Sequence, residues 1–73
     1  MTLLEAIKTH NEGKIALHKA NIAVYIKNPV GIGEHSDIAE SVEKELLKIA
    51  EAQDIIDMID KHFKLEEQLP LFS

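Results

Sequence analysis

The longest regular pattern of apolar residues in the chain runs from Ile38 to Phe63. Residues recur there in alternating steps of four and three, and Glu45 is the one polar member of the series. This spacing places them along one side of an α-helix, as in helices that pack against other helices. The sequence therefore predicts a helix over about residues 37–64. The residues of this seam, which we expect to form an oligomer interface, are Ile38, Val42, Glu45, Ile49, Ala52, Ile56, Ile59 and Phe63.

An earlier segment predicts another helix, over about residues 2–27. Thr2 and Glu5 have the spacing of a capping box, in which each side chain accepts a hydrogen bond from the other residue's backbone N–H. Up to Lys27 there is no proline and one glycine, Gly13, which costs about 1 kcal/mol relative to alanine inside a helix. We expect partial burial of some polar residues that interrupt the apolar rows of this helix, namely Asn11, Lys14, His18 and Asn21.

Residues 28–36 form the predicted loop between the helices. Pro29 removes a backbone donor, and the two glycines that follow it permit positive φ angles. Ser36 or Asp37 is the expected N-cap of the second helix, and Asp37 with Glu40 has capping-box spacing. Two helices of similar length joined by a short loop form an antiparallel hairpin.

The size of the chain points to an oligomer. A chain of 73 residues seldom buries enough apolar surface to be stable without a cross-link or a partner, and this one has no cysteine. A single hairpin would also leave much of its wide apolar face in water. We therefore predict an all-α, two-helix antiparallel hairpin that dimerises into a four-helix bundle.

The charges argue against direct binding to nucleic acid. The formal net charge is −5, and all eight basic residues are lysines that stand singly along the chain. Proteins that grip a phosphate backbone usually cluster positive charge and favour arginine. No apolar run is long enough to span a membrane, and acidic Glu5 stands where a secretory signal would be basic. We expect a cytoplasmic protein with no membrane contact.

No constellation of residues predicts catalysis, a metal site or a cofactor. Acidic pairs occur on the second helix, but both share that one helix, so they cannot converge on one ion within a chain. Di-iron helical bundles use Glu-x-x-His pairs, whereas an isoleucine stands three residues before each of the four histidines. We expect a non-enzymatic protein in which Asp57 pairs with Lys61 on a solvated face.

Glu45 is the polar exception in the apolar seam, and His18 lies near the middle of the other predicted helix. A hydrogen bond between them would fix the register of the bundle, as a polar seam residue can. Alternatively, Glu45 lays its methylene groups along the interface and extends its carboxylate to the rim. The sequence leaves both interpretations open.

The last residues, Gln68-Leu69-Pro70-Leu71-Phe72-Ser73, resemble a known interaction motif. Gln-Leu-Pro-Leu-Phe is similar to the pentapeptide by which bacterial polymerases and repair proteins bind the DNA sliding clamp. The resemblance implies clamp binding through Gln68 as polar anchor, Leu69 as a secondary contact, and Leu71 and Phe72 as the pair that fills a hydrophobic pocket. It implies a small adaptor protein, which we expect to be non-catalytic. Pro70 stops any helix at or before Leu69, so we expect a mobile tail over residues 68–73.

The alternative is that the apolar residues of this segment pack on the bundle. The chain would then be a structural or regulatory helical-bundle protein whose partner the sequence does not name.

The loop carries a second resemblance. Residues 28–38, Asn-Pro-Val-Gly-Ile-Gly-Glu-His-Ser-Asp-Ile, are similar to small uncharacterised helical proteins of tailed bacteriophages, especially marine ones. The resemblance implies a phage origin, and hence a bacterial host cytoplasm as the location. It implies no specific activity.

Overall fold

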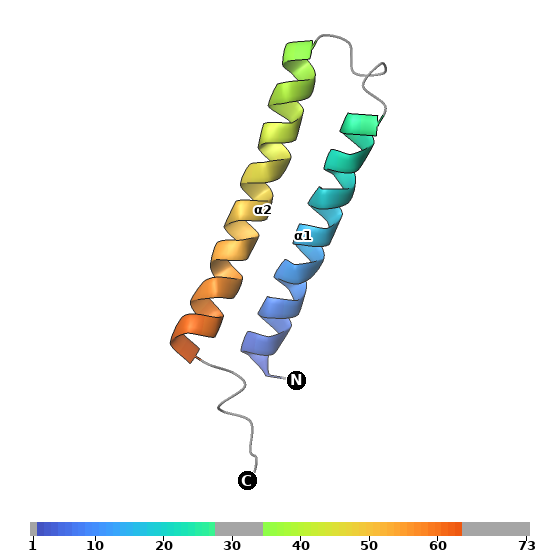
Figure 1. The fold of residues 1–73 in the computed structure, drawn as a ribbon. Coiled ribbons are helices and arrows are strands. Elements are labelled where there is room, and N and C mark those ends of the chain that lie inside the picture. Colours follow the sequence, from blue (N-terminus) through green and yellow to red (C-terminus); the bar gives the residue numbers. More distant parts are fainter. Residues whose placement is uncertain (1, 28–34, 64–73) are drawn as a thin grey trace.

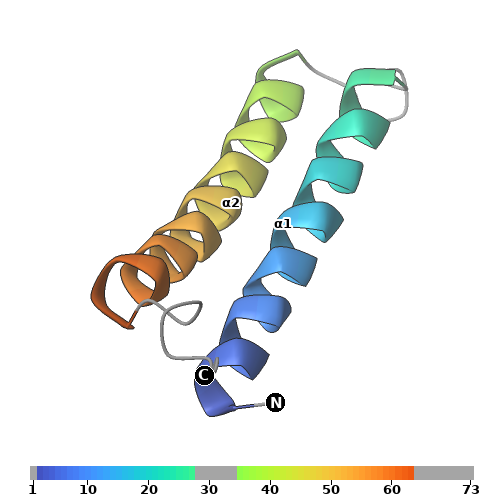
Figure 2. The ribbon, with the colours of Figure 1, turned by 60° about the horizontal axis from the view of Figure 1, so that its bottom comes forward.

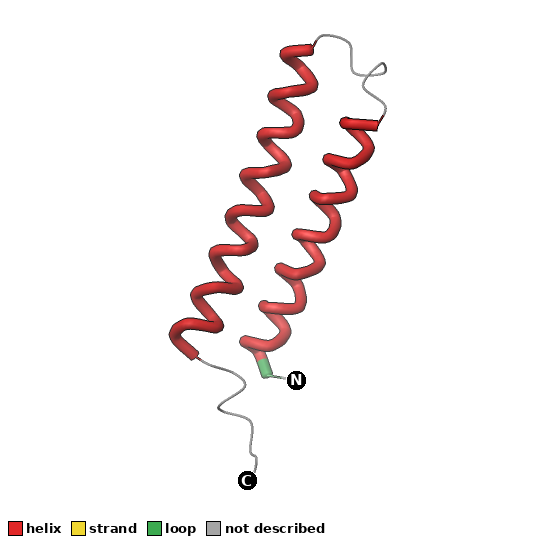
Figure 3. The backbone as a smooth tube through the Cα atoms, in the orientation of Figure 1, coloured by secondary structure: helices red, strands yellow, loops and turns green. Residues whose placement is uncertain are grey.

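Two antiparallel α-helices make up the part of the chain that the structure describes. The computed structural model describes residues 2–27 and 35–63, which form α1 (Leu3–Lys27) and α2 (His35–Phe63) (Figure 1). The helices lie side by side along their length in a second view (Figure 2). Both are continuous coils, and residues 2–27 and 35–63 contain no strand (Figure 3). The predicted all-α hairpin is confirmed, whereas its pairing into a four-helix bundle stays a prediction.

The start of α1 is fixed by the predicted capping box. The Thr2 backbone N–H donates to Oε1 of Glu5 at 2.7 Å, and the Glu5 N–H donates to Oγ1 of Thr2 at 3.1 Å. The first backbone bond of the helix runs from the Ala6 N–H to the Thr2 carbonyl at 3.0 Å. The backbone hydrogen bond from Thr2 lowers the pKa of the Glu5 carboxyl, so the box is at full strength when this carboxyl is ionised.

The start of α2 differs from the sequence expectation. The helix begins at His35, so Ser36 and Asp37 lie in its first turn rather than at its N-cap. The last two residues of the predicted loop, His35 and Ser36, therefore belong to α2. The earlier start has a simple reason, because His35 and Ser36 follow the last glycine and can adopt helical geometry. Their helix propensities differ little from those of other polar residues. Residues 28–34, the predicted end of this helix at 64 and the predicted tail, 68–73, lie outside the described residues.

The predicted seam of α2 faces α1 within the same chain. Ala52, Ile56 and Ile59 are buried and form the apolar core of the described part. Ile38, Val42, Glu45 and Ile49 are half-buried, whereas Phe63 at the end of the helix is exposed. Contact of these eight residues with a second chain stays a prediction.

The matching seam on α1 is much more polar. Its members also recur in steps of four and three, and each is buried or half-buried: Leu4, Lys8, Asn11, Ile15, His18, Ile22 and Tyr25. Lysine, asparagine and histidine interrupt the apolar residues of this series. The heptad spacing of α1 is therefore hard to recognise in the sequence alone. The expected partial burial of Lys14, His18 and Asn21 is confirmed, and Asn11 is more deeply buried than expected.

A large share of the apolar surface remains outside this core. Nine large hydrophobic side chains are between 40% and 76% exposed: Leu3, Leu17, Val24, Ile26, Leu46, Leu47, Ile55, Met58 and Phe63. Isolated exposed apolar residues are normal, but contiguous ones usually mark a binding surface. The hairpin therefore offers apolar surface on both helices for a further partner.

Candidate functional site

A polar cluster of three side chains lies between the helices near their midpoints. Oε1 of Glu45 on α2 lies 2.6 Å from Nδ1 of His18 and 3.0 Å from Nδ2 of Asn21, both on α1. His18 and Asn21 are three residues apart, so they lie on the same side of α1 and reach the same oxygen. An ionised carboxylate only accepts hydrogen bonds, so the Nδ1–H of His18 and the amide of Asn21 are the donors. The hypothesised bond between His18 and Glu45 is present.

These hydrogen bonds also set the charge state of Glu45. The amide of Asn21 and then the imidazole of His18 lower the pKa of the Glu45 carboxyl below its ordinary value of 4.5, against a smaller opposing effect of desolvation. Glu45 is therefore ionised at neutral pH. The side chains of His18 and Glu45 are only 12% and 14% exposed, so the carboxylate does not extend freely to the rim.

Because folding lowers the pKa of Glu45, this group should make stability depend on pH. Its contribution is fully present above the unfolded-state pKa and is lost as pH falls through the lower folded-state value. We expect Glu45→Gln to destabilise the protein at about pH 5, and the difference from the unsubstituted protein to shrink towards about pH 3. Urea midpoints at both pH values measure this, with Glu51→Gln, an exposed carboxylate on the same helix, as control. A constant difference between the two pH values would contradict the assignment.

Asn11 is the second polar group inside the hairpin. Its side chain is 3% exposed, and Nδ2 donates to the carbonyl of Ile7 at 2.9 Å, one turn earlier in the same helix. Oδ1 is buried without a hydrogen-bond partner in the described structure. A buried acceptor left unpaired costs about 1–3 kcal/mol, so this position lowers stability relative to an apolar one.

The register of the hairpin places Asn11 opposite Ala52. Asn11 lies seven residues before His18, and Ala52 lies seven residues after Glu45. Seven residues are about two helical turns, so in antiparallel helices the two residues meet two turns beyond the His18–Glu45 contact. Ala52 is fully buried. This small residue gives the Asn11 amide room between the helices.

One edge of the hairpin is marked by an ion pair. Nζ of Lys8 lies 2.8 Å from Oδ1 of Asp60, with both side chains partly exposed. A pair of this kind contributes little stability, in the range of about 0–1 kcal/mol. The expected pairing of Asp57 with Lys61 is not seen between these two described residues. Asp57 accepts a hydrogen bond from Nε2 of Gln53 at 3.1 Å.

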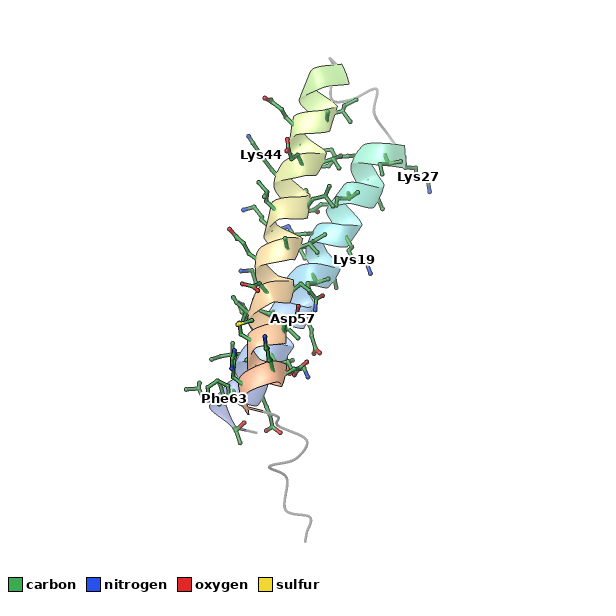
Figure 4. The ribbon with its side chains drawn as sticks, turned by 60° about the vertical axis from the view of Figure 1, so that its left-hand side comes forward. Lys19, Lys27, Lys44, Asp57 and Phe63 are labelled. Carbon is green, nitrogen blue, oxygen red and sulfur yellow. The ribbon has the colours of Figure 1, made fainter. Side chains whose placement is uncertain are left out.

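The histidines and acidic residues of the described helices do not gather into a metal site. No group of three potential metal ligands occurs within residues 2–27 and 35–63. Lys19 and Lys27 project from α1 on one side of the molecule, whereas Lys44 projects from α2 on the other (Figure 4). Neither described helix has a stretch long and apolar enough to cross a membrane.

Gln68, Leu69, Leu71 and Phe72, the residues expected to bind a sliding clamp, lie outside the described residues. The site that the structure does assemble is the His18–Asn21–Glu45 cluster. Sequence reasoning proposed the first and last of these residues but missed Asn21, although its three-residue spacing from His18 could have indicated it. The cluster consists of hydrogen-bonding groups from both helices, and its geometry suits the fixing of helix register.

No protein-family model, curated protein or solved structure matches the chain.

Proposed function

We propose that the chain is a small non-catalytic adaptor that docks on a bacterial DNA sliding clamp through residues 68–72 and dimerises through its helical hairpin. The observation that carries this proposal is the sequence Gln68-Leu69-Pro70-Leu71-Phe72, which resembles the clamp-binding pentapeptide at each of its defining positions. The dimer is a four-helix assembly of two hairpins.

The chemistry of the pentapeptide suits a pocket on another protein. The Gln68 amide both donates and accepts hydrogen bonds, which fits a polar subsite. Leu71 and Phe72 supply adjacent apolar side chains, and an aromatic ring buries a large area at little conformational cost. Pro70 restricts the backbone before binding and so lowers the ordering cost.

Two features support this role: the position of the pentapeptide after α2 and its duplication in a dimer. α2 ends at Phe63, and the pentapeptide begins five residues later. A dimer carries two such segments, and binding of the first raises the effective concentration of the second at the same clamp ring. Avidity of this kind strengthens docking without any new contact.

A binding titration against a purified clamp tests the proposal. We expect Phe72→Ala to weaken binding by at least about tenfold, because truncation of an aromatic anchor at an interface commonly costs more than about 1.4 kcal/mol. Ser73→Ala is the control, since Ser73 directly follows the pentapeptide and stands outside it. Indistinguishable isotherms for Phe72→Ala and the unsubstituted protein would refute clamp docking.

A second candidate function rests on the exposed apolar side chains of α2. Leu46, Leu47, Ile55 and Met58 are each at least 40% exposed, as expected for a structural or regulatory module that binds another protein through its helices. In that case residues 68–73 would pack on the helices. Deleting them would then lower the melting temperature clearly, whereas the clamp proposal expects an unchanged melting temperature and oligomeric state.

A further inference from the structure

The side of α1 that α2 leaves uncovered carries a second heptad series. Its members recur in steps of three and four, and all are exposed: Leu3, Ala6, His10, Gly13, Leu17, Ala20 and Val24. We call this series the outer seam. It contains no aspartate, glutamate, lysine or arginine over about 32 Å of helix. An uncharged strip of this length on an exposed helix is a contact surface rather than a solvated face.

The outer seam lies on the edge of the hairpin opposite the Lys8–Asp60 ion pair. Around the axis of α1, Lys8 lies about 80° to one side of His18, and Leu17 lies about 100° to the other. Around α2, Asp60 and Ile55 likewise lie on opposite sides of Glu45. Ile55, with neighbouring Met58, therefore shares an edge with the outer seam and widens its apolar surface.

Side-chain size alternates along the outer seam. The larger residues recur every seven positions at Leu3, His10, Leu17 and Val24, and the small ones recur every seven positions at Ala6, Gly13 and Ala20. A Cβ atom added to Gly13 would meet nothing within 4 Å. Packing within the hairpin therefore does not require a glycine here, although the glycine costs the helix about 1 kcal/mol. A neighbour that packs closely over this position would need it.

We propose that the outer seam binds the outer seam of a second copy of this chain in an antiparallel pair. When the two helices overlap over their full length, Gly13 lies opposite Leu17 of the second copy, and Ala6 lies opposite Val24 of the second copy. His10 then lies opposite Ala20 of the second copy. His10, Leu17 and Val24 each meet a small residue, so the helices pack closely about a two-fold axis. Leu3, at the end of the outer seam, lies opposite Lys27 of the second copy.

The same series fits a parallel pair poorly. Parallel pairing would set large residues against large and small against small, and the large layers would hold the helices apart where glycine and alanine leave voids. It would also align the two helix dipoles, whereas antiparallel pairing opposes them.

Self-complementarity is the reason for assigning a second copy as the occupant. A two-fold interface requires one surface to match itself after rotation, and the alternation of sizes at seven-residue spacing meets that condition. From helix dimensions, a strip of this length and a third of the circumference buries about 700 Å² in two copies. Ile55 and Met58 add to that area. An interface of this size is smaller than those of stable complexes, so we expect a weak, concentration-dependent dimer.

This inference deepens the dimerisation in the proposed function by naming its surface and orientation. It does not depend on clamp binding, because substitutions in the outer seam leave residues 68–72 intact. A negative result in one experiment therefore does not decide the other.

Sedimentation over a concentration series tests the surface with two matched leucines. Leu17 in the outer seam is 58% exposed, and Leu46 on the other edge of the hairpin is 52% exposed. We expect Leu17→Gln to weaken self-association by about tenfold or more, equivalent to about 1.4 kcal/mol, and Leu46→Gln to leave it unchanged. A monomer at all concentrations, or an equal effect of the two variants, would overturn the proposal.

Gly13→Gln separates association from folding. Glutamine favours the helix over glycine, and the hairpin leaves space for it, so helicity by circular dichroism should be retained or raised. Self-association should nevertheless fall by about tenfold or more, because the longer side chain prevents close approach. Unchanged association would overturn the assignment of Gly13 to the interface.

The orientation is measured by spin labels. The chain has no cysteine, so Lys27→Cys gives a single labelling site at the exposed end of α1. Antiparallel pairing places Lys27 opposite Leu3 of the second copy, so the two labels should lie about 36 Å apart. A distance near one helix diameter, on the order of 10 Å, would show parallel pairing and overturn the proposed orientation.

Discussion

Replacing Ile56 with alanine is expected to lower the free energy of unfolding by about 2–5 kcal/mol. Ile56 is 6% exposed and is one of three buried hydrophobic residues in the described core. Truncation removes buried methyl and methylene groups and leaves a cavity between two helices that have few other buried contacts. For a hairpin of this size, such a loss is a large fraction of the total stability. Urea unfolding followed by circular dichroism measures it.

Ile26→Ala is the matched control for this prediction. Ile26 is also a helical isoleucine but is 67% exposed, so its truncation should change the free energy of unfolding by no more than about 0.5 kcal/mol. Protein concentration must be held constant, because the proposed self-association would shift apparent stability. Equal losses in the two variants would mean that the core does not lie between the helices as described.

Enlarging Ala52 to leucine is expected to destabilise the hairpin by about 1–3 kcal/mol. Ala52 has no solvent exposure and lies opposite the buried Asn11 side chain, so added methyl groups have no free space. Ala50→Leu is the control, because Ala50 is exposed two residues earlier on α2. It should change stability by less than about 0.5 kcal/mol.

A second substitution at Asn11 should partly restore the stability that Ala52→Leu removes. Asn11→Ala removes the buried amide, whose Oδ1 has no partner, and vacates volume for the larger side chain that Ala52→Leu introduces. The double variant should therefore be more stable than the sum of the two single effects by about 0.5–3 kcal/mol. Additive effects in thermal or urea unfolding would show that the two residues do not face each other.

The helices could be predicted because their signals are local. The capping box at Thr2 and the proline after α1 set helix limits through neighbouring residues, and α1 begins within one residue of the expected position. The seam of α2 was also evident, since one polar residue does not hide a heptad pattern. The start of α2 was placed two residues late, because capping residues resemble ordinary polar residues of a first helical turn.

Only part of the candidate site could be predicted, because the site depends on contacts between the two helices. The polar residues of the α1 seam mask its spacing, and only the register with α2 shows that Asn11 is buried and that Asn21 joins His18 at Glu45. The Lys8–Asp60 pair joins residues 52 positions apart, which no local pattern indicates. The cleaner apolar pattern of α2 pointed to that helix as the oligomer interface, whereas the uncovered heptad series lies on α1.

The polar cluster at Glu45 has a consequence for mispairing of the two helices. A slip of α2 by one heptad would keep most apolar residues in contact, so the apolar pattern discriminates weakly between registers. Such a slip would place Glu45 opposite Asn11 or Tyr25 instead of His18, and the carboxylate would lose its imidazole donor. A slipped hairpin therefore loses both hydrogen bonds that hold the Glu45 carboxylate in the observed register. Contacts between the helices therefore set their alignment. The connection between α1 and α2 need only be long enough to let the helices meet.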